Sequence, residues 1–545
     1  MSNDYEAKNA NDRLLDILTL ERRDILIMLI LIIGVGLLGI STPVAVQVLV
    51  NMVNMGGVMQ PLYVVSIILF TLILLSGALY VLENYIVELI QRRIFVRSAI
   101  DATHKIQACQ FEASNNSNLN ELVNRFFDVM TMQKTAAGLL TTGLSSVLQG
   151  VIGCIILMFY SYYFIIAVFI LVAFVIFIIT VIGRKGCETA IKESTIKYEV
   201  AAWLETIAKN NHTFKFYNGK SQAENRTNSL IDSYLNKRTQ HFKVLLMQNI
   251  GGAFMYAFFG TLMLMLGGTL VINGQINLGQ FVAAELIIFS VLIAFIRVIA
   301  QLEYYYDISA AADKLGILQD LPQENIGSHP FSTISAYKLS IDMTLCTFSY
   351  LHPNLKRLKF EVQPNQKIAV MGSAGSGKSF LSELITGLIT PCNGVIKYND
   401  IDIGLLNMPE VRKSIGFAHN IEILEDTLLE NIQFGRDVEI EEISSLLKEL
   451  NFQDAVNVLE DGIYTKLNAR GLPLNSAQQR KLILARAIIA KPHLLIINGI
   501  LDNFDMNEID LICKVLFKHA QSLLIMTTLP TIAARCDATI KLGVD

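Results

Sequence analysis

Long uncharged apolar stretches fill much of the first 300 residues. No Asp, Glu, Lys or Arg occurs in residues 25–82 or 135–183, and only Glu285 interrupts residues 244–296. A bilayer-spanning helix needs roughly 20 apolar residues, so each stretch has room for two spans. Turn-forming residues lie near the middle of each, at 51–61, 160–163 and 273–279. The pattern predicts three helical hairpins, with six spans at about 25–50, 62–86, 135–158, 161–183, 245–271 and 279–302.

Three spans of double length are the alternative to the hairpins. A 50-residue helix would be about 75 Å long, far beyond the roughly 30 Å of a bilayer core. The length of the stretches and the turn residues at their centres therefore favour six spans.

Composition divides the chain into a membrane part and an aqueous part. Charged residues make up 17% and hydrophobic residues 52% of the sequence, whereas soluble domains carry about 25% charged residues. Outside the three apolar stretches the charge content is ordinary. This excludes a wholly soluble protein, a disordered chain and a disulfide scaffold. A net charge of −4 gives no indication of a nucleic-acid partner.

The basic residues predict how the spans are oriented. The hairpin tips carry no Lys or Arg, whereas the intervening segments carry Arg92, Arg93, Arg97 and many more between residues 184 and 243. Positive charges stay on the cytoplasmic side. Both termini are therefore expected in the cytoplasm.

The remaining pattern predicts four regions. Residues 1–23 form an N-terminal cytoplasmic segment whose end suits a helix lying on the membrane surface, and residues 24–303 form the membrane domain. Charged stretches at 83–134 and 184–243 extend the spans into the cytoplasm. Each has one polar break, which fits either a turn with a short helix or a plain loop. Residues 304–335 read as a linker, and 336–545 as an α/β domain.

A phosphate-binding motif opens the α/β domain. The apolar run 367–371 predicts a strand, and a helical pattern starts at Phe380. Between them lies the sequence G-x-x-x-x-G-K-[ST] in its strand–loop–helix setting, formed by Gly372, Ser373, Ala374, Gly375, Ser376, Gly377, Lys378 and Ser379. The glycines let backbone N–H groups surround phosphate, Lys378 supplies charge to the β- and γ-phosphates, and the Ser379 hydroxyl suits Mg²⁺.

With these motifs, nearly the whole chain resembles an ABC exporter half-transporter. The resemblance implies a multi-domain fold: an all-α six-helix transmembrane domain and an α/β P-loop nucleotide-binding domain. It implies ATP and Mg²⁺ as ligands and a dimer, either a homodimer or a heterodimer with another half-transporter. Tyr350 matches the adenine-stacking aromatic, and His419 or Asn420 the glutamine of the Q-loop. The signature segment, which acts across the dimer, corresponds to Leu474, Asn475, Ser476, Ala477 and Gln478.

Segments 88–97 and 279–285 resemble the bacterial type I secretion branch of the family. That branch implies the bacterial inner membrane, a peptide or protein substrate, and partnership with a periplasmic adaptor and an outer-membrane channel. Glu285, inside a predicted span, is a candidate for substrate contact or proton coupling. The alternative, which the same acid in the resembling branch favours, is a protonated side chain between helices.

The chain departs from the family at the positions that carry hydrolysis. Asn498 and Gly499 stand where the Walker B strand ends in Asp-Glu, and Thr527 or Thr528 replaces the switch histidine. Gly499 cannot polarise the attacking water, and Asn498 holds the metal less strongly. The expectation is retained ATP binding at a weakened Mg²⁺ site, with slow or no hydrolysis. Two functions fit: an exporter subunit with impaired hydrolysis, or a non-hydrolysing regulatory or scaffolding subunit partnered with an active ABC chain.

Overall fold

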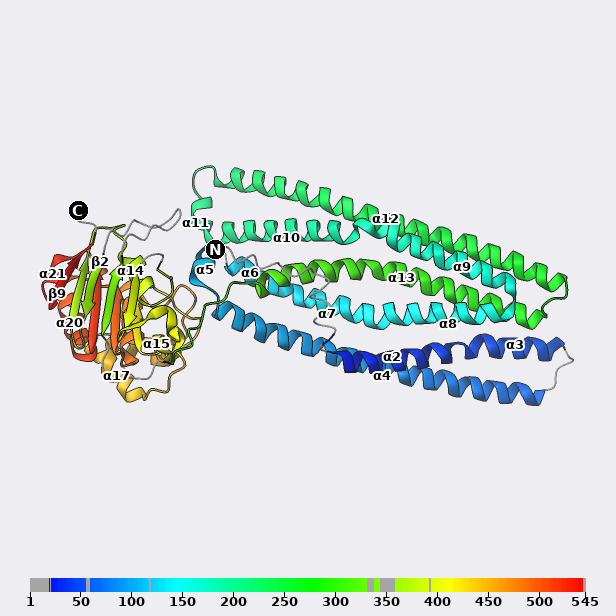
Figure 1. Cartoon of the computed structure of the whole chain (residues 1–545), viewed down its shortest axis with the longest axis horizontal. Coiled ribbons are helices and arrows are strands. Elements are labelled where there is room, and N and C mark those ends of the chain that lie inside the picture. Colours follow the sequence, from blue (N-terminus) through cyan, green and yellow to red (C-terminus); the bar gives the residue numbers. More distant parts are fainter. Residues whose placement is uncertain are drawn as a thin grey trace. The chain divides into compact units, whose positions relative to one another are not determined.

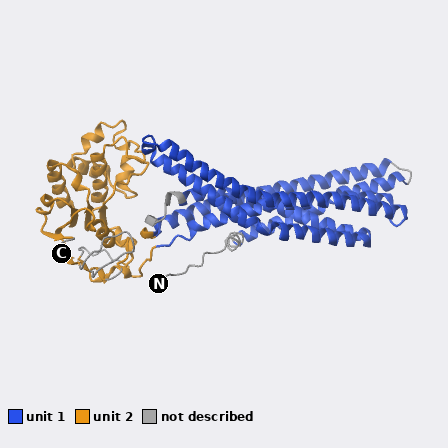
Figure 2. Ribbon diagram, turned by 90° about the horizontal axis from the view of Figure 1, so that it is seen from above, with its two compact units in different colours: residues 1–109, 113–323 blue, residues 110–112, 324–545 orange. Residues whose placement is uncertain are grey.

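The computed structural model describes residue 19 and residues 21–54, 59–116, 119–330, 338–343, 358–391 and 394–542. The chain divides into two compact units (Figure 2): residues 1–109 with 113–323, and residues 110–112 with 324–545. The first unit is helical and the second contains both β-sheets.

Long helices lie side by side along the first unit (Figure 1). Within the described residues, six helical stretches are long and apolar enough to cross a membrane: Arg22–Asn54, Met59–Gln107, Leu122–Tyr160, Tyr162–Lys209, Gly219–Ile272 and Leu278–Gln319. Four of these stretches are 42 to 54 residues long, so they continue well beyond the apolar spans into the charged segments. The expected six-helix membrane fold is thus present.

Several of these stretches consist of shorter elements. The first is α2 (Arg22–Gly39) with α3 (Ser41–Asn54), and the second is α4 (Met59–Gln107). The third begins within α6 (Leu119–Asn124) and continues through the 3₁₀ turn η1 (Arg125–Phe127), α7 (Asp128–Gly138), the π-helical turn η2 (Leu139–Gly143) and α8 (Leu144–Tyr160). The fourth contains α9 (Tyr162–Phe177), the π-helical η3 (Ile178–Ile182), η4 (Gly183–Lys185) and α10 (Gly186–Lys209); α12 (Gly219–Ile272) and α13 (Leu278–Gln319) complete the set.

The polar breaks carry short helices. Helix α5 (Phe111–Asn116) lies at the first break and α11 (Asn211–Phe214) at the second. The structure therefore favours the turn-with-helix interpretation over a plain loop at both positions.

The linker expected from residue 304 is wrong in its first half, because α13 remains helical to Gln319. Residues 304–319 lack a simple apolar period, yet small side chains bury a face there: Ser309, Ala310, Ala311 and Ala312 are all at most 6% exposed. Close packing of small residues, which leaves little hydrophobic periodicity, explains the missed helix.

Glycines let the membrane helices pack closely. A Cβ added at Gly153 of α8 would lie 2.3 Å from Cγ2 of Val291 on α13, and one added at Gly150 would lie 2.8 Å from the Phe295 ring. Small residues at such crossings allow the close approach that stabilises helix pairs in lipid. The apolar outer faces, such as Ile67 and Phe70 on α4, are exposed as lipid-facing surfaces should be.

The second unit holds two sheets. A parallel sheet has the order β6-β7-β8-β3-β9, built from β3 (Lys367–Met371), β6 (Ile415–Ala418), β7 (Leu494–Asn498), β8 (Ser522–Thr527) and β9 (Ala538–Lys541). An antiparallel sheet has the order β2-β1-β4-β5, from β1 (Leu339–Met343), β2 (Leu358–Val362), β4 (Val395–Tyr398) and β5 (Ile401–Asp402).

The helices of this unit lie between the strands along the chain, and four of them in succession separate β6 from β7. They are α14 (Lys378–Ile385), α15 (Met408–Arg412), α16 (Leu428–Gln433), α17 (Ile440–Glu449), α18 (Gln453–Asn457), α19 (Ser476–Ile489), α20 (Met506–His519) and α21 (Pro530–Ala533), with 3₁₀ turns at Ile403–Leu405, Gly462–Tyr464 and Leu501–Asn503. Strands β7 and β8 are buried along their whole length, as expected for central strands of a parallel sheet.

The register of the parallel sheet brings three chain segments to one edge. Met371 pairs with Thr527, and Asn498 pairs with Met526. The residues that follow β3, β7 and β8 therefore emerge together at the carboxyl ends of the strands, where ligands of open α/β sheets bind.

Candidate functional site

The loop between β3 and α14 has the geometry of a phosphate cradle. Gly375 and Gly377 adopt φ values of +80° and +92°, a left-handed conformation that glycine adopts without steric cost. A Cβ at Gly372 would meet Ser376 Oγ at 2.2 Å, so the tight turn also requires glycine there. Ser373, Ala374 and Gly375 are exposed, which leaves their backbone open to a ligand.

Lys378 lies folded over the loop. Its Nζ donates to the carbonyl of Gly372 at 2.7 Å and to that of Ser373 at 2.8 Å. Burial lowers the pKa of the Lys378 ammonium below its ordinary value, and the negative charge of Asp502 partly offsets that shift. A phosphate would offer this ammonium a stronger, charge-assisted partner than two carbonyls.

Asn498, at the end of β7, is held by two side chains. Its Nδ2 donates to Ser382 Oγ at 3.1 Å, while Ser382 itself donates to the Ser379 carbonyl at 2.6 Å. The same amide nitrogen lies 2.8 Å from Nδ1 of His419. Because Ser382 uses its only proton elsewhere, it must accept from Asn498, which fixes the orientation of the amide. The second amide proton then goes to His419.

His419 is neutral in this arrangement. Burial lowers its pKa below the ordinary 6.5, with the charge of Glu422 acting in the opposite direction. An unprotonated Nδ1 accepts the Asn498 proton, so the remaining ring proton resides on Nε2. Of the two candidates for the Q-loop position, the structure connects His419 to the site, whereas Asn420 is exposed.

The two threonines at the switch position contact Asp502. Thr528 donates to Asp502 Oδ2 from its backbone N–H at 2.8 Å and from its hydroxyl at 2.7 Å, and the Thr527 hydroxyl donates to Oδ1. Gly499 has a φ of +67° and contributes no side chain. Asp502, three residues beyond the position of the missing glutamate, therefore contributes a carboxylate at this edge of the sheet.

The signature-like segment begins a helix. Leu474 is buried, and Asn475 caps α19: its Oδ1 accepts from the Gln478 N–H at 2.9 Å, while Gln478 Oε1 accepts from the Asn475 N–H at 2.9 Å. Ser476 is exposed and Ala477 is half-buried. Tyr350, the expected adenine-stacking residue, lies outside the described residues.

The cradle fits the phosphates of ATP better than it fits the accompanying Mg²⁺. Backbone N–H groups, two left-handed glycines and an ammonium suit a polyphosphate. For the metal, Ser379 is exposed at the start of α14, and Asn498 offers a neutral oxygen. Mg²⁺ prefers one or two carboxylates beside phosphate oxygens, so this donor set fits the ion less well.

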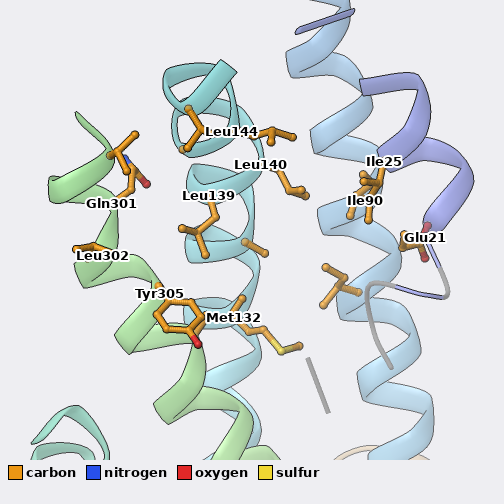
Figure 3. A pocket seen from close by; sticks show the side chains of 16 residues that line it. Glu21, Ile25, Ile90, Met132, Leu139, Leu140, Leu144, Gln301, Leu302 and Tyr305 are labelled. Carbon is orange, nitrogen blue, oxygen red and sulfur yellow. The ribbon is translucent and has the colours of Figure 1, made fainter. Parts of the chain in front are cut away.

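The membrane unit contains a largely apolar cavity of about 610 Å³. Figure 3 shows Gln301, Leu302 and Tyr305 of α13 on one side, and Ile25 and Ile90 of α2 and α4 on the other. The π-helical turn η2 contributes Leu139 and Leu140; such turns occur often at functional sites.

Glu285 does not line this cavity. It is half-buried on α13, and its Oε1 is buried with no hydrogen-bond partner among the described residues. A second membrane acid, Glu83 of α4, is 1% exposed and accepts from Ser145 at 3.4 Å. The charge pattern does not single out Glu83, because it directly follows the first uncharged stretch. No local pattern indicates the contacts of Ser382 and Asp502, because their partners are distant in sequence.

Comparison with known protein families agrees with both units. The family described as ABC transporter transmembrane region matches residues 25–295, and the family described as ABC transporter matches residues 355–499. The chain belongs to the ABC transporters. It has the architecture of a half-transporter, with a six-span membrane domain fused to an ATP-binding domain.

Individual relatives are distant. The chain is 26% identical over 367 residues to a putative export ATP-binding/permease protein of Rickettsia bellii, in a match covering 65% of this chain and 62% of that protein. It is 25% identical over 292 residues to the mitochondrial iron-sulfur clusters transporter ATM1 of Saccharomyces cerevisiae, covering 52% of this chain and 41% of that one. The structure of a bacterial Atm1-family ABC exporter with ATP bound superimposes with a TM-score of 0.80 at 18% identity, covering 96% of this chain and 95% of that chain.

Proposed function

We propose that this chain is one half of an ATP-binding exporter that moves its substrate outward by alternating access as a dimer, with impaired hydrolysis at its own nucleotide site. The observation that carries the proposal is the cradle at residues 372–379, with Lys378 held over it by two loop carbonyls. Two such domains would close around ATP, each adding its 474–478 segment to the partner's site.

The impairment follows from the side chains at the ends of β7 and β8. Asn498 is neutral and directs its amide protons at Ser382 and His419. Gly499 has no group to act on water, and loss of a general base typically lowers the rate about 10²- to 10⁴-fold. The chain would thus bind ATP well and turn it over slowly.

A regulatory or scaffolding subunit without hydrolysis is the second candidate. Gly499 and the loss of the switch histidine favour it, because both groups that would act on the γ-phosphate and water are absent from the sequence. In that case an active ABC chain would supply the intact motifs.

We place the protein in a bacterial inner membrane with both termini in the cytoplasm. A homodimer or a heterodimer with another half-transporter follows from the architecture. The type I secretion resemblance supports a peptide or protein substrate, a periplasmic adaptor and an outer-membrane channel. The relatives named above, which include an iron-sulfur clusters transporter, suggest a substrate other than a peptide or protein. The apolar cavity of the membrane unit suits apolar parts of a substrate. Glu285 and Glu83 are additional candidates for substrate contact.

Binding and turnover measured on the purified chain in lipid test the proposal. We expect saturable ATP binding that Lys378→Ala abolishes, with turnover far below one per second. Turnover of several per second that disappears in Lys378→Ala would overturn the proposal that hydrolysis at this site is impaired. Absence of ATP binding in the wild type would overturn the function itself.

A further inference from the structure

We infer that Asp502, held by Thr527 and Thr528, supplies the acidic metal-binding group of the nucleotide site in place of the Walker B carboxylates. The inference rests on the proposed ATP-binding function. It assigns a role in holding Mg²⁺ to a residue three positions beyond Gly499.

The location of Asp502 follows from the register of the sheet. Its partner Thr527 is the last residue of β8 and pairs with Met371, the residue directly before the phosphate loop. Lys378 contacts the carbonyl of the next residue, Gly372. The groups that hold Asp502 and the Lys378 ammonium therefore lie at the ends of the neighbouring strands β8 and β3, and the negative charge of Asp502 acts on Lys378.

The Asp502 carboxylate is held in one orientation and can still accept a further ligand or donor. Three donors from two consecutive threonines fix its plane. A carboxylate has about four lone-pair sites. Hydrogen bonds among the described residues use one on Oδ1 and two on Oδ2, which leaves one on Oδ1 for a further partner. Oriented carboxylates of this kind are how proteins position a metal or a metal-bound water.

The negative charges of Asp502 and of a bound triphosphate make a divalent metal ion the expected ligand of this carboxylate. Compared with the Asp-Glu that ends the Walker B strand in the family, Asn498 and Gly499 leave the nucleotide site with two fewer negative charges. The triphosphate itself is anionic, so an uncompensated carboxylate beside it would be repulsive, whereas a divalent cation between the two makes it attractive. One of the two threonines stands where the family has the switch histidine, and both donate to the Asp502 carboxylate.

Nucleotide affinity with and without metal tests this assignment. The full chain in lipid nanodiscs is titrated with a fluorescent ATP analogue, MANT-ATP, in EDTA and in Mg²⁺. We expect Mg²⁺ to tighten binding to the wild type about 10-fold or more, and Asp502→Asn to abolish that gain, since lost metal-site groups cost about 10- to 100-fold in affinity. Binding in EDTA should be undiminished in Asp502→Asn, which shows an intact fold.

Three further variants sharpen the outcome. Thr528→Val should reduce the gain partly, because it removes one of the hydroxyl bonds that orient Asp502. The double variant Asp502→Asn/Asn498→Asp should recover it, since the carboxylate returns at the family position. Asp454→Asn, the same charge change at an exposed position of α18, should leave it unchanged.

Two results overturn the inference in distinguishable ways. An equal Mg²⁺ gain in the wild type and Asp502→Asn, or no gain in a wild type that binds MANT-ATP in EDTA, refutes the metal role but leaves ATP binding standing. A wild type that binds no MANT-ATP in either condition refutes the proposed function and this inference together.

Discussion

The side-chain amide of Asn498 lies 2.8 Å from Nδ1 of His419 and joins the Walker B position to the Q-loop position. In a working site of this family these positions hold an acid and a glutamine. Here a neutral amide donates to a neutral imidazole, and the same nitrogen donates to Ser382. The pair joins the ends of β7 and β6 through two neutral groups.

The Asn498–His419 bond should make stability sensitive to acid. Burial lowers the pKa of His419 below its ordinary 6.5, so the unfolded chain takes up this proton at a higher pH than the folded chain. The His419 contribution to stability is therefore present above 6.5 and is lost as pH falls from 6.5 toward the lower folded value. We expect the thermal midpoint to fall more on acidification from pH 7.5 to 5.5 (about one unit either side of 6.5) in the wild type than in His419→Gln. Equal slopes by differential scanning fluorimetry would contradict this.

The close crossing of α8 and α13 should not tolerate a methyl group. A Cβ at Gly153 would lie 2.3 Å from Val291, whereas a Cβ at Gly268 on α12 meets nothing within 4 Å. We expect Gly153→Ala to lose about 1–3 kcal/mol of stability through overpacking, and Gly268→Ala to be neutral or slightly stabilising. Thermal unfolding in detergent compares the two; similar midpoints for both variants would show that the crossing accommodates a methyl group.

The signature segment caps helix α19 through Asn475, and this structural role can be tested by its effect on stability. Asn475 Oδ1 accepts from the Gln478 N–H at 2.9 Å. Loss of an N-cap costs about 1 kcal/mol, and serine caps nearly as well as asparagine. Asn475→Ala should therefore lower the thermal midpoint of the nucleotide-binding unit, while Asn475→Ser, which restores the family residue, should retain it. A serine variant as unstable as the alanine variant would argue against the capping role.

Membrane orientation can be tested with single cysteines. The chain has 7 cysteines, which are first replaced by serine. An impermeant maleimide applied to spheroplasts should then label Asn273→Cys, between α12 and α13, but label Lys215→Cys, beside α11, only after lysis. The reverse labelling would invert the topology and place the ATP site outside the cytoplasm.

The parts of the structure that the sequence predicted are those set by local pattern. Apolar length determined the six spans, and the glycine spacing of 372–379 determined a loop whose dihedral angles require glycine. The features that the sequence pattern did not predict depend on tertiary packing. The end of α13 is helical because small residues pack there, and Asp502 accepts hydrogen bonds from Thr527 and Thr528 because the end of β8 lies beside it. Side chains far apart in sequence meet at the sheet edge, and no local pattern encodes that meeting.

The central claim is that this chain binds ATP at a site that lacks the groups for hydrolysis. Its most direct test is ATP turnover by the purified chain in lipid, compared with the triple variant Asn498→Asp/Gly499→Glu/Thr528→His, which restores the family residues. Lys378→Ala in both backgrounds serves as the control. The account predicts a gain of about 10²-fold or more in the triple variant, abolished by Lys378→Ala, with ATP affinity little changed. A wild type that already hydrolyses ATP as fast as the triple variant would contradict it.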